Sequence, residues 1–168
     1  MRKHFLRATI LIGFIFSGIF MQSKIQAQTQ DSNQTLQPNE RIVREMFAAY
    51  GRSDYDALKR LFAEEVVYHI PGRNDFSKDY NGQKAVFDLF ERQKKRMGGK
   101  PYKVEIMDLL VSEKHVVALT RVEAQAAGKS ATWRGSNVYR ISNGKIAEAW
   151  FMLDDLYAYD QFWTAATK

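Results

Sequence analysis

One histidine in the sequence is a candidate for proton transfer. His69 lies in the segment VVYHIPG, residues 66–72, whose β-branched and aromatic residues predict a strand that stops at the Pro-Gly pair. By alternation its side chain shares a strand face with Val67 and opposes Tyr68 and Ile70. An imidazole can take up a proton near neutral pH without a large pKa shift, which makes His69 a candidate general base. The alternative is a histidine hydrogen-bonded in the core or at a pocket wall.

Two carboxylates end the last predicted strand, just before a terminal helix over residues 156–164. Asp154 and Asp155 are candidates for acid and base chemistry. Either can instead cap the helix by accepting hydrogen bonds from its first backbone N–H groups. We expect capping to be the role of at least one of them.

Large apolar side chains supply candidate walls for a small-molecule pocket. Aromatic residues make up 13% of the chain, enough for a compact core. The candidates for the pocket walls are Trp150, Met152, Phe90, Tyr50 and Trp133. Each of them can equally be an ordinary core residue.

The first residues have the pattern of an export signal. Basic residues at positions 2, 3 and 7 precede an almost wholly apolar run over residues 8–20, which is shorter than the roughly 20 residues that span a membrane. We predict a signal peptide over residues 1–27, a flexible polar linker over residues 28–39, and a folded domain over residues 40–168. The mature protein would then be periplasmic or secreted and have no stable membrane span; the alternative is an uncleaved anchor.

The charge and the residue types exclude several classes of function. Four of the 25 Lys and Arg residues and none of the 19 acidic residues precede residue 28, so 21 basic residues face 19 acidic ones in the mature chain, a net charge near +2. That balance argues against a nucleic acid partner. The absence of cysteine excludes disulfides and a thiol nucleophile, and three histidines leave little material for a metal site. We expect neither metal nor cofactor.

The pattern along the chain predicts an α+β domain. Apolar stripes predict helices after Asn39, after Ser53 and after Gly82, with the strand that contains His69 between the second and the third. Four long strands follow as an antiparallel meander over residues 102–111, 115–126, 130–141 and 145–153. Asn143-Gly144 predicts a type I′ hairpin between the last two. Because strands of about ten residues curl, we expect three N-terminal helices packed on a strongly curved, mainly antiparallel sheet that forms a cone-shaped barrel.

This order of elements carries a family resemblance. The most telling segments are VVYHIPG at residues 66–72, KDYNGQKAV at 78–86, GKIAEAW at 144–150 and DLYAYDQFW at 155–163. Over residues 40–163 the chain resembles the SnoaL-like branch of the nuclear transport factor two-like superfamily, which includes ketosteroid isomerases, polyketide cyclases, dehydratases, epoxide hydrolases and non-enzymatic pocket proteins. The resemblance implies a cone around a small-molecule pocket and, commonly, a homodimer.

The resemblance to ketosteroid isomerases implies roles for two residues. His69 falls where those enzymes carry their general-base aspartate, and Asn137 falls where they keep a protonated aspartic acid that donates to an oxyanion. An amide can also donate, although Met46 stands where the partner tyrosine of the isomerases is found. Alternatively, Asn137 orders strand edges or a buried water.

The resemblance to polyketide cyclases concerns the end of the last strand. Those enzymes use an aspartate after a Glu-x-Trp pattern, which reappears as Glu148-Ala149-Trp150. The cyclase spacing favours Asp154, whereas the pattern of bacterial relatives without an assigned reaction favours Asp155.

Three hypotheses of function follow. The first is an exported, cofactor-free acid–base enzyme of the isomerase, cyclase or hydratase type, acting on an apolar carbonyl or hydroxyl compound; it requires His69 inside the cone near Asn137, Asp154 or Asp155. The second is a non-catalytic exported protein that binds a small apolar molecule and lacks a converging acid–base pair. The third is a homodimer whose exposed sheet face is the functional surface.

Overall fold

The computed structural model describes residues 37–126 and 128–164. The predicted signal peptide and most of the predicted linker lie outside these residues. The elements, in chain order, are α1 (Pro38–Arg52), α2 (Tyr55–Leu61), β1 (Phe62–His69), β2 (Asp79–Asn81), α3 (Gln83–Arg96), β3 (Lys103–Val111), β4 (His115–Ala126), β5 (Lys129–Ser142), β6 (Lys145–Leu153) and α4 (Leu156–Trp163). No described helix is long and apolar enough to cross a membrane.

The strands form one mixed sheet in the order β2-β1-β6-β5-β4-β3. The predicted meander is confirmed, because β3 to β6 pair in sequence and antiparallel. Its last turn brings Ser142 opposite Lys145, and Asn143 and Gly144 have φ angles of 51° and 70°, as a type I′ hairpin requires. β1 then pairs with β6 in the parallel direction, which extends the sheet beyond β6.

The α+β class is confirmed, and the first strand lies between the second and third helices, as predicted. The three helices are nevertheless not all N-terminal to the sheet, because α3 follows β1 and β2. The sheet is open, with β2 and β3 at its edges, so it does not close into a barrel. The strand β2 was not predicted, because three residues are too short to display an alternating pattern.

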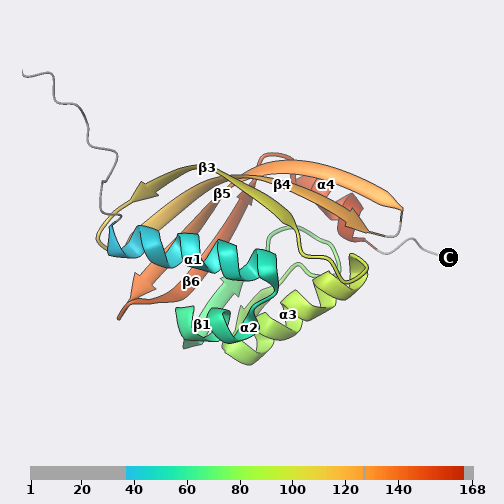
Figure 1. Cartoon of the computed structure of the whole chain (residues 1–168). Coiled ribbons are helices and arrows are strands. Elements are labelled where there is room, and N and C mark those ends of the chain that lie inside the picture. The colour runs from blue at the N-terminus through green and yellow to red at the C-terminus, as the bar shows by residue number, and fades with distance from the viewer. Residues whose placement is uncertain (1–36, 127, 165–168) are drawn as a thin grey trace, which may run out of the picture. The chain divides into compact units, whose positions relative to one another are not determined.

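The helices cover one face of this sheet. Figure 1 shows the strands β3 to β6 arching over α1, with α3 beside it on the same side. β4 and β5 are 12 and 14 residues long, so they bend over the helices instead of lying flat. Gly135 on β5 permits a close approach to β6, since a Cβ there would lie 2.7 Å from the carbonyl oxygen of Met152. The space between the helices and the curved sheet is where the candidate site lies.

A hydrogen-bonded anchor holds α4 to the segment after β1. Both carboxylate oxygens of Asp160 accept from the backbone N–H of Arg73 at 2.9 Å, and one accepts from the Asn74 side chain at 2.8 Å. Gly72 has a φ of 96°, and a Cβ at this position would overlap the Asp160 carboxylate. Only glycine meets both demands. The anchor fixes α4 so that the neighbouring Tyr159 reaches the cavity under the sheet.

Candidate functional site

An apolar cavity lies between the curved sheet and the helices. About 670 Å³ of space lies between its walls, mouth included, and the centre of a water molecule can move through about 80 Å³ of it. The second value is well below the ~300–1,000 Å³ of typical small-molecule sites, so the aromatic walls leave a narrow slot. The lining side chains are those of Met46, Phe47, Tyr50, Tyr68, Ile70, Phe90, Gln93, Tyr102, Val104, Thr120, Val122, Trp133, Asn137, Tyr139, Phe151, Leu153 and Tyr159.

The cavity walls are uncharged at neutral pH. None of the described side chains that line the cavity is a carboxylate, an imidazole, an amine or a guanidinium. Five tyrosines contribute hydroxyl groups, and burial raises the pKa of each above its ordinary value, so each keeps its proton; they are Tyr50, Tyr68, Tyr102, Tyr139 and Tyr159. The cavity therefore offers hydrogen bonds without offering charge.

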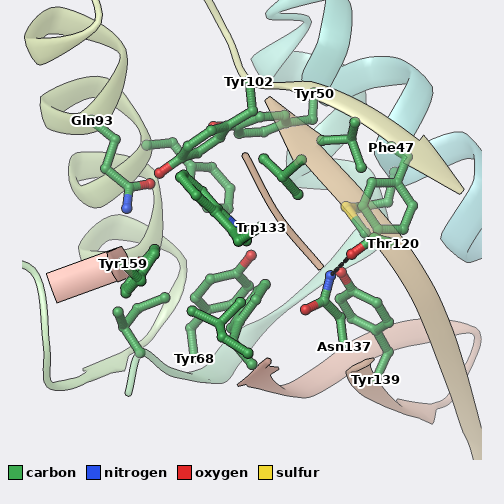
Figure 2. A pocket seen from close by; sticks show the side chains of 17 residues that line it. Phe47, Tyr50, Tyr68, Gln93, Tyr102, Thr120, Trp133, Asn137, Tyr139 and Tyr159 are labelled. Atoms are coloured by element: carbon green, nitrogen blue, oxygen red, sulfur yellow. Dashed lines mark hydrogen bonds between the residues drawn. The ribbon is translucent and has the colours of Figure 1, made fainter. Parts of the chain in front are cut away.

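Asn137 provides an unused hydrogen-bond acceptor in the cavity. It projects from β5 and is 4% exposed, and its Nδ2 donates to the Thr120 hydroxyl on β4 at 3.2 Å. Its Oδ1 is buried and has no partner among the described residues. Figure 2 shows this oxygen turned away from Thr120 toward the space between the aromatic rings. A buried acceptor without a partner costs about 1–3 kcal/mol, so this atom is suited to a ligand that donates.

A second amide reaches the cavity from the helix side. Gln93 lies on the buried face of α3 with Leu89 and Phe90, and it is only 4% exposed. Figure 2 shows its side chain extended beside Tyr102, with no hydrogen bond to the other lining side chains. The polar groups of Gln93 and Asn137 thus enter the cavity from opposite walls.

Most of the predicted wall residues do line the cavity. Tyr50 and Phe90 form an edge-to-face pair with ring centroids 5.2 Å apart, and both contribute to the wall together with Trp133. Trp150 and Met152 do not, because they alternate along β6 with the lining residues Phe151 and Leu153. Met152 is 56% exposed on the opposite face of the sheet.

The prediction that His69 points into the cone is wrong. Its neighbour Tyr68 lines the cavity, so His69 projects from the other face of β1. There its Nδ1 lies 2.7 Å from Asp79 Oδ1, and its Nε2 lies 3.1 Å from Glu148 Oε1. The ring also stacks on Trp150, with centroids 5.4 Å apart. The expected partners Asn137, Asp154 and Asp155 do not contact it.

The partners of His69 favour its protonated form. Both ring nitrogens face carboxylate oxygens, and only the imidazolium can donate to both. Partial burial lowers the pKa of His69, but the hydrogen bonds and charges of Asp79 and Glu148 outweigh it, and the net shift is upward. For Glu148, partial burial raises the pKa, whereas His69 and the Arg140 guanidinium, whose Nε donates at 2.9 Å, lower it further than burial raises it. Asp79, His69 and Glu148 thus form a charged clamp that joins β2, β1 and β6.

The two aspartates after β6 have structural roles. Asp155 caps α4, since its side chain accepts from the N–H of Ala158 at 2.9 Å, which confirms the expectation that at least one of them is a cap. Asp154 accepts from the backbone N–H of Arg134 on the adjacent strand at 3.0 Å. Neither lines the cavity.

Several residues of the site were absent from the sequence-based prediction. Tyr102, Tyr139 and Tyr159 were not singled out, and Tyr68 was placed only on the strand face opposite His69. A usable signal existed for Gln93, a polar residue on the apolar stripe of a predicted helix. Tyrosines at inward positions of several strands are a second such signal, because their rings fit an apolar wall and their hydroxyls require a polar neighbour.

Known proteins share this fold and part of this sequence. The family model described as a SnoaL-like domain matches residues 43–149. Bal32a, encoded by a soil-derived mobile gene cassette, is 31% identical, with a TM-score of 0.72 over 75% of this chain and 96% of its own. An uncharacterized protein of Mycobacterium tuberculosis is 27% identical over 73% of this chain and 93% of its own.

More distant structures share the fold alone. A putative polyketide cyclase from Streptomyces antibioticus, IdmH, is 15% identical, with a TM-score of 0.61 over 76% of this chain and 99% of its own. A nuclear transport factor two-like protein of unknown function from Burkholderia pseudomallei is 20% identical, with a TM-score of 0.68 over 77% of this chain and 100% of its own. With most of its described domain matched by the family model, the chain belongs to the SnoaL-like domain family.

Proposed function

We propose that this protein binds a small, neutral, largely apolar molecule in the cavity and does not transform it by acid–base chemistry. The observation that carries the proposal is the buried Asn137 Oδ1, which has no partner among the described residues and faces an uncharged aromatic slot. Apolar contact supplies affinity at about 25 cal/mol per Å² of surface removed from water, before the costs of association. A donor on the ligand restores the missing hydrogen bond and sets the orientation.

The charge of the walls restricts the class of ligand. An ion that enters the slot loses its hydration, and none of the described lining side chains offers it an opposite charge. A flat, neutral molecule with a hydroxyl or N–H group loses little hydration free energy and gains the hydrogen bond to Asn137. Phenols and hydroxylated ring compounds fit this description.

The position of the ionisable residues argues against the acid–base enzyme. General acid–base catalysis needs a titrating group within about 3 Å of the substrate proton or one water away. His69 lies on the outer face of the sheet, and Asp154 and Asp155 bond to backbone N–H groups. The cavity tyrosines have raised pKa values and act as donors near neutral pH.

Calorimetric titration with two matched probes tests the proposal. 2-Naphthol donates a hydrogen bond, whereas 2-methoxynaphthalene has a similar shape and only accepts. We expect 2-naphthol to bind about fivefold to tenfold more tightly. The substitution Asn137→Leu should abolish that preference, and the control Ser136→Ala, one residue away on the opposite strand face, should keep it. If neither probe binds, or if Asn137→Leu leaves the preference intact, the proposal fails.

We also propose that the protein is exported. The support is the leader, in which basic residues precede a short apolar run ending near residue 20. N-terminal sequencing of protein from the periplasm or the medium should find a start near residue 28. Recovery of an intact Met1 from a membrane pellet would contradict cleavage.

We further propose that the outer sheet face pairs two copies of the chain. An apolar row crosses four strands there, formed by the register neighbours Leu110, Val117, Val138 and Trp150. Leu110 is exposed in the single chain. Sedimentation should find a dimer that Leu110→Lys weakens, and a monomer at all concentrations would refute pairing.

A further inference from the structure

We infer that the ligand is two-ended: a flat apolar body with one hydrogen-bonding group for Asn137 and another, at the far end, for Gln93. This inference rests on the proposed binding function and adds the second anchor. It follows from the two amides that enter the same cavity from β5 and from α3.

Gln93 is unusual for its position. Its neighbours on the buried face of α3 are Val86 and Leu89, both fully buried, and Phe90. An amide at such a place loses its hydration, and this loss is offset only by hydrogen bonds. Figure 2 draws no hydrogen bond from Gln93 to any other lining side chain. Because its side chain lines the cavity, the amide can reach a molecule in the slot.

The two amides are separated by the aromatic walls. Figure 2 places Gln93 at one end of the lining side chains and Asn137 at the other, with Trp133 between them. Trp133 meets Tyr102 and Tyr159 edge to face, with ring centroids 5.9 Å and 5.3 Å apart. These rings define a slot for a flat body, and each end of the slot has one amide. A ligand with a single polar group uses only one of them.

The experiment compares two-ended with one-ended phenols. The pairs are 2,6-dihydroxynaphthalene with 2-naphthol and 4,4′-dihydroxybiphenyl with 4-hydroxybiphenyl, which test two different spans. We expect at least one two-ended phenol to bind about fivefold to tenfold more tightly than its one-ended counterpart by calorimetry, the gain typical of one added hydrogen bond.

Variants assign the gain to the two anchors. Gln93→Met keeps the length of the side chain and removes the amide, so it should abolish the gain of the two-ended phenols. Asn137→Leu should weaken both members of each pair. The control Gln125→Met, at an exposed glutamine outside the cavity, should change neither.

The outcomes separate the two proposals. If the one-ended phenols bind in an Asn137-dependent manner and neither second hydroxyl adds affinity, the two-ended ligand is refuted while the binding function stands. A gain that survives Gln93→Met also refutes it. If none of the phenols binds, the binding function fails and this inference fails with it. The comparison of ligands on the unmodified protein does not depend on any variant folding.

Discussion

Strands β1, β5 and β6 each present alternate residues to two different environments. On the inner face Tyr68, Asn137 and Phe151 line an uncharged cavity. One residue further along, on the outer face, His69 is part of a charged clamp with Glu148. The polar groups of the inner face are amides and hydroxyls, and those of the outer face are ions that retain contact with water.

The difference follows from desolvation. An ion on the inner face would lose its hydration without an opposite charge nearby. A neutral amide loses less hydration free energy, and a hydrogen bond from a ligand can offset that loss. Recognition on the inner face is therefore by shape and hydrogen bonds. On the outer face the ion pairs join neighbouring strands, at a modest gain because water and salt screen them.

A carboxylate should destabilise the protein far more on the inner face of β6 than at the next position, on the outer face. We expect Phe151→Glu to lower the free energy of unfolding by about 3 kcal/mol or more, because it removes the ring that meets Tyr68 with centroids 4.7 Å apart and buries a carboxylate. Met152→Glu, on the exposed face, should change it by less than about 0.5 kcal/mol. Urea unfolding at a dilution where both variants are monomeric measures this. Equal losses would mean that the two faces are not distinct.

A smaller, pH-dependent loss should follow Asn137→Asp. Burial should raise the pKa of the new carboxyl above the ~3.9 of the unfolded chain, so the folded form binds a proton that the unfolded form releases. The free energy of unfolding should then fall by up to about 1.4 kcal/mol per pH unit above pH 4, until the folded pKa is reached. At pH 3 the protonated Asp side chain is nearly isosteric with Asn, so the substitution should lower the free energy of unfolding only slightly. In contrast, Ser136→Asp on the outer face should show no such slope, and a flat profile for Asn137→Asp would contradict a dry inner face.

The smallest effect should come from the outer clamp. Because the folded pKa of His69 is raised, its stabilisation is complete below the unfolded value of about 6.5 and is lost as pH rises through the folded pKa. Glu148 has a lowered pKa, so its contribution holds above about 4.5 and is lost only as pH falls through its folded value. We expect His69→Gln to lower the free energy of unfolding by up to about 1 kcal/mol at pH 5.5.

His69→Gln also tests the ionic character of the clamp and its independence from the cavity. The deficit of His69→Gln should shrink by pH 8.5 and in high salt, and the affinity for 2-naphthol should stay within twofold. Urea titrations at the two pH values and one calorimetric titration measure these quantities. An equal deficit at both pH values would show that the clamp is not ionic, and a large loss of affinity would place His69 in the binding site after all.

The alternation of side chains along a strand predicted which residues share a face of the sheet, but not which face lines the cavity. It correctly placed His69 opposite Tyr68 on β1, because the period of a strand is a local property. It could not show that the face packed on the helices is also the face that lines the cavity, and the titratable His69 was therefore predicted to be the cavity residue in place of Tyr68. Trp150 was misplaced for the same reason.

Features that depend on a few adjacent residues were predicted best, and pairings between distant segments were predicted worst. The Asn143-Gly144 turn and the Asp155 cap rest on a few adjacent residues, and both are confirmed. The parallel pairing of β1 with β6 joins segments that no local pattern relates, and β2 is too short to be recognised. Asn137 was found through the family resemblance, although its partner Thr120 was not.

The parallel pairing of β1 with β6 also bears on the rate at which the cavity forms. β3 to β6 are joined by short turns, whereas His69 meets Glu148 across 79 positions of sequence. Contacts between distant segments form late, since a long loop must close before they stabilise the chain. The cavity wall supplied by Tyr68 is therefore completed near the end of folding, and a ligand inside should slow unfolding while leaving the folding rate nearly unchanged.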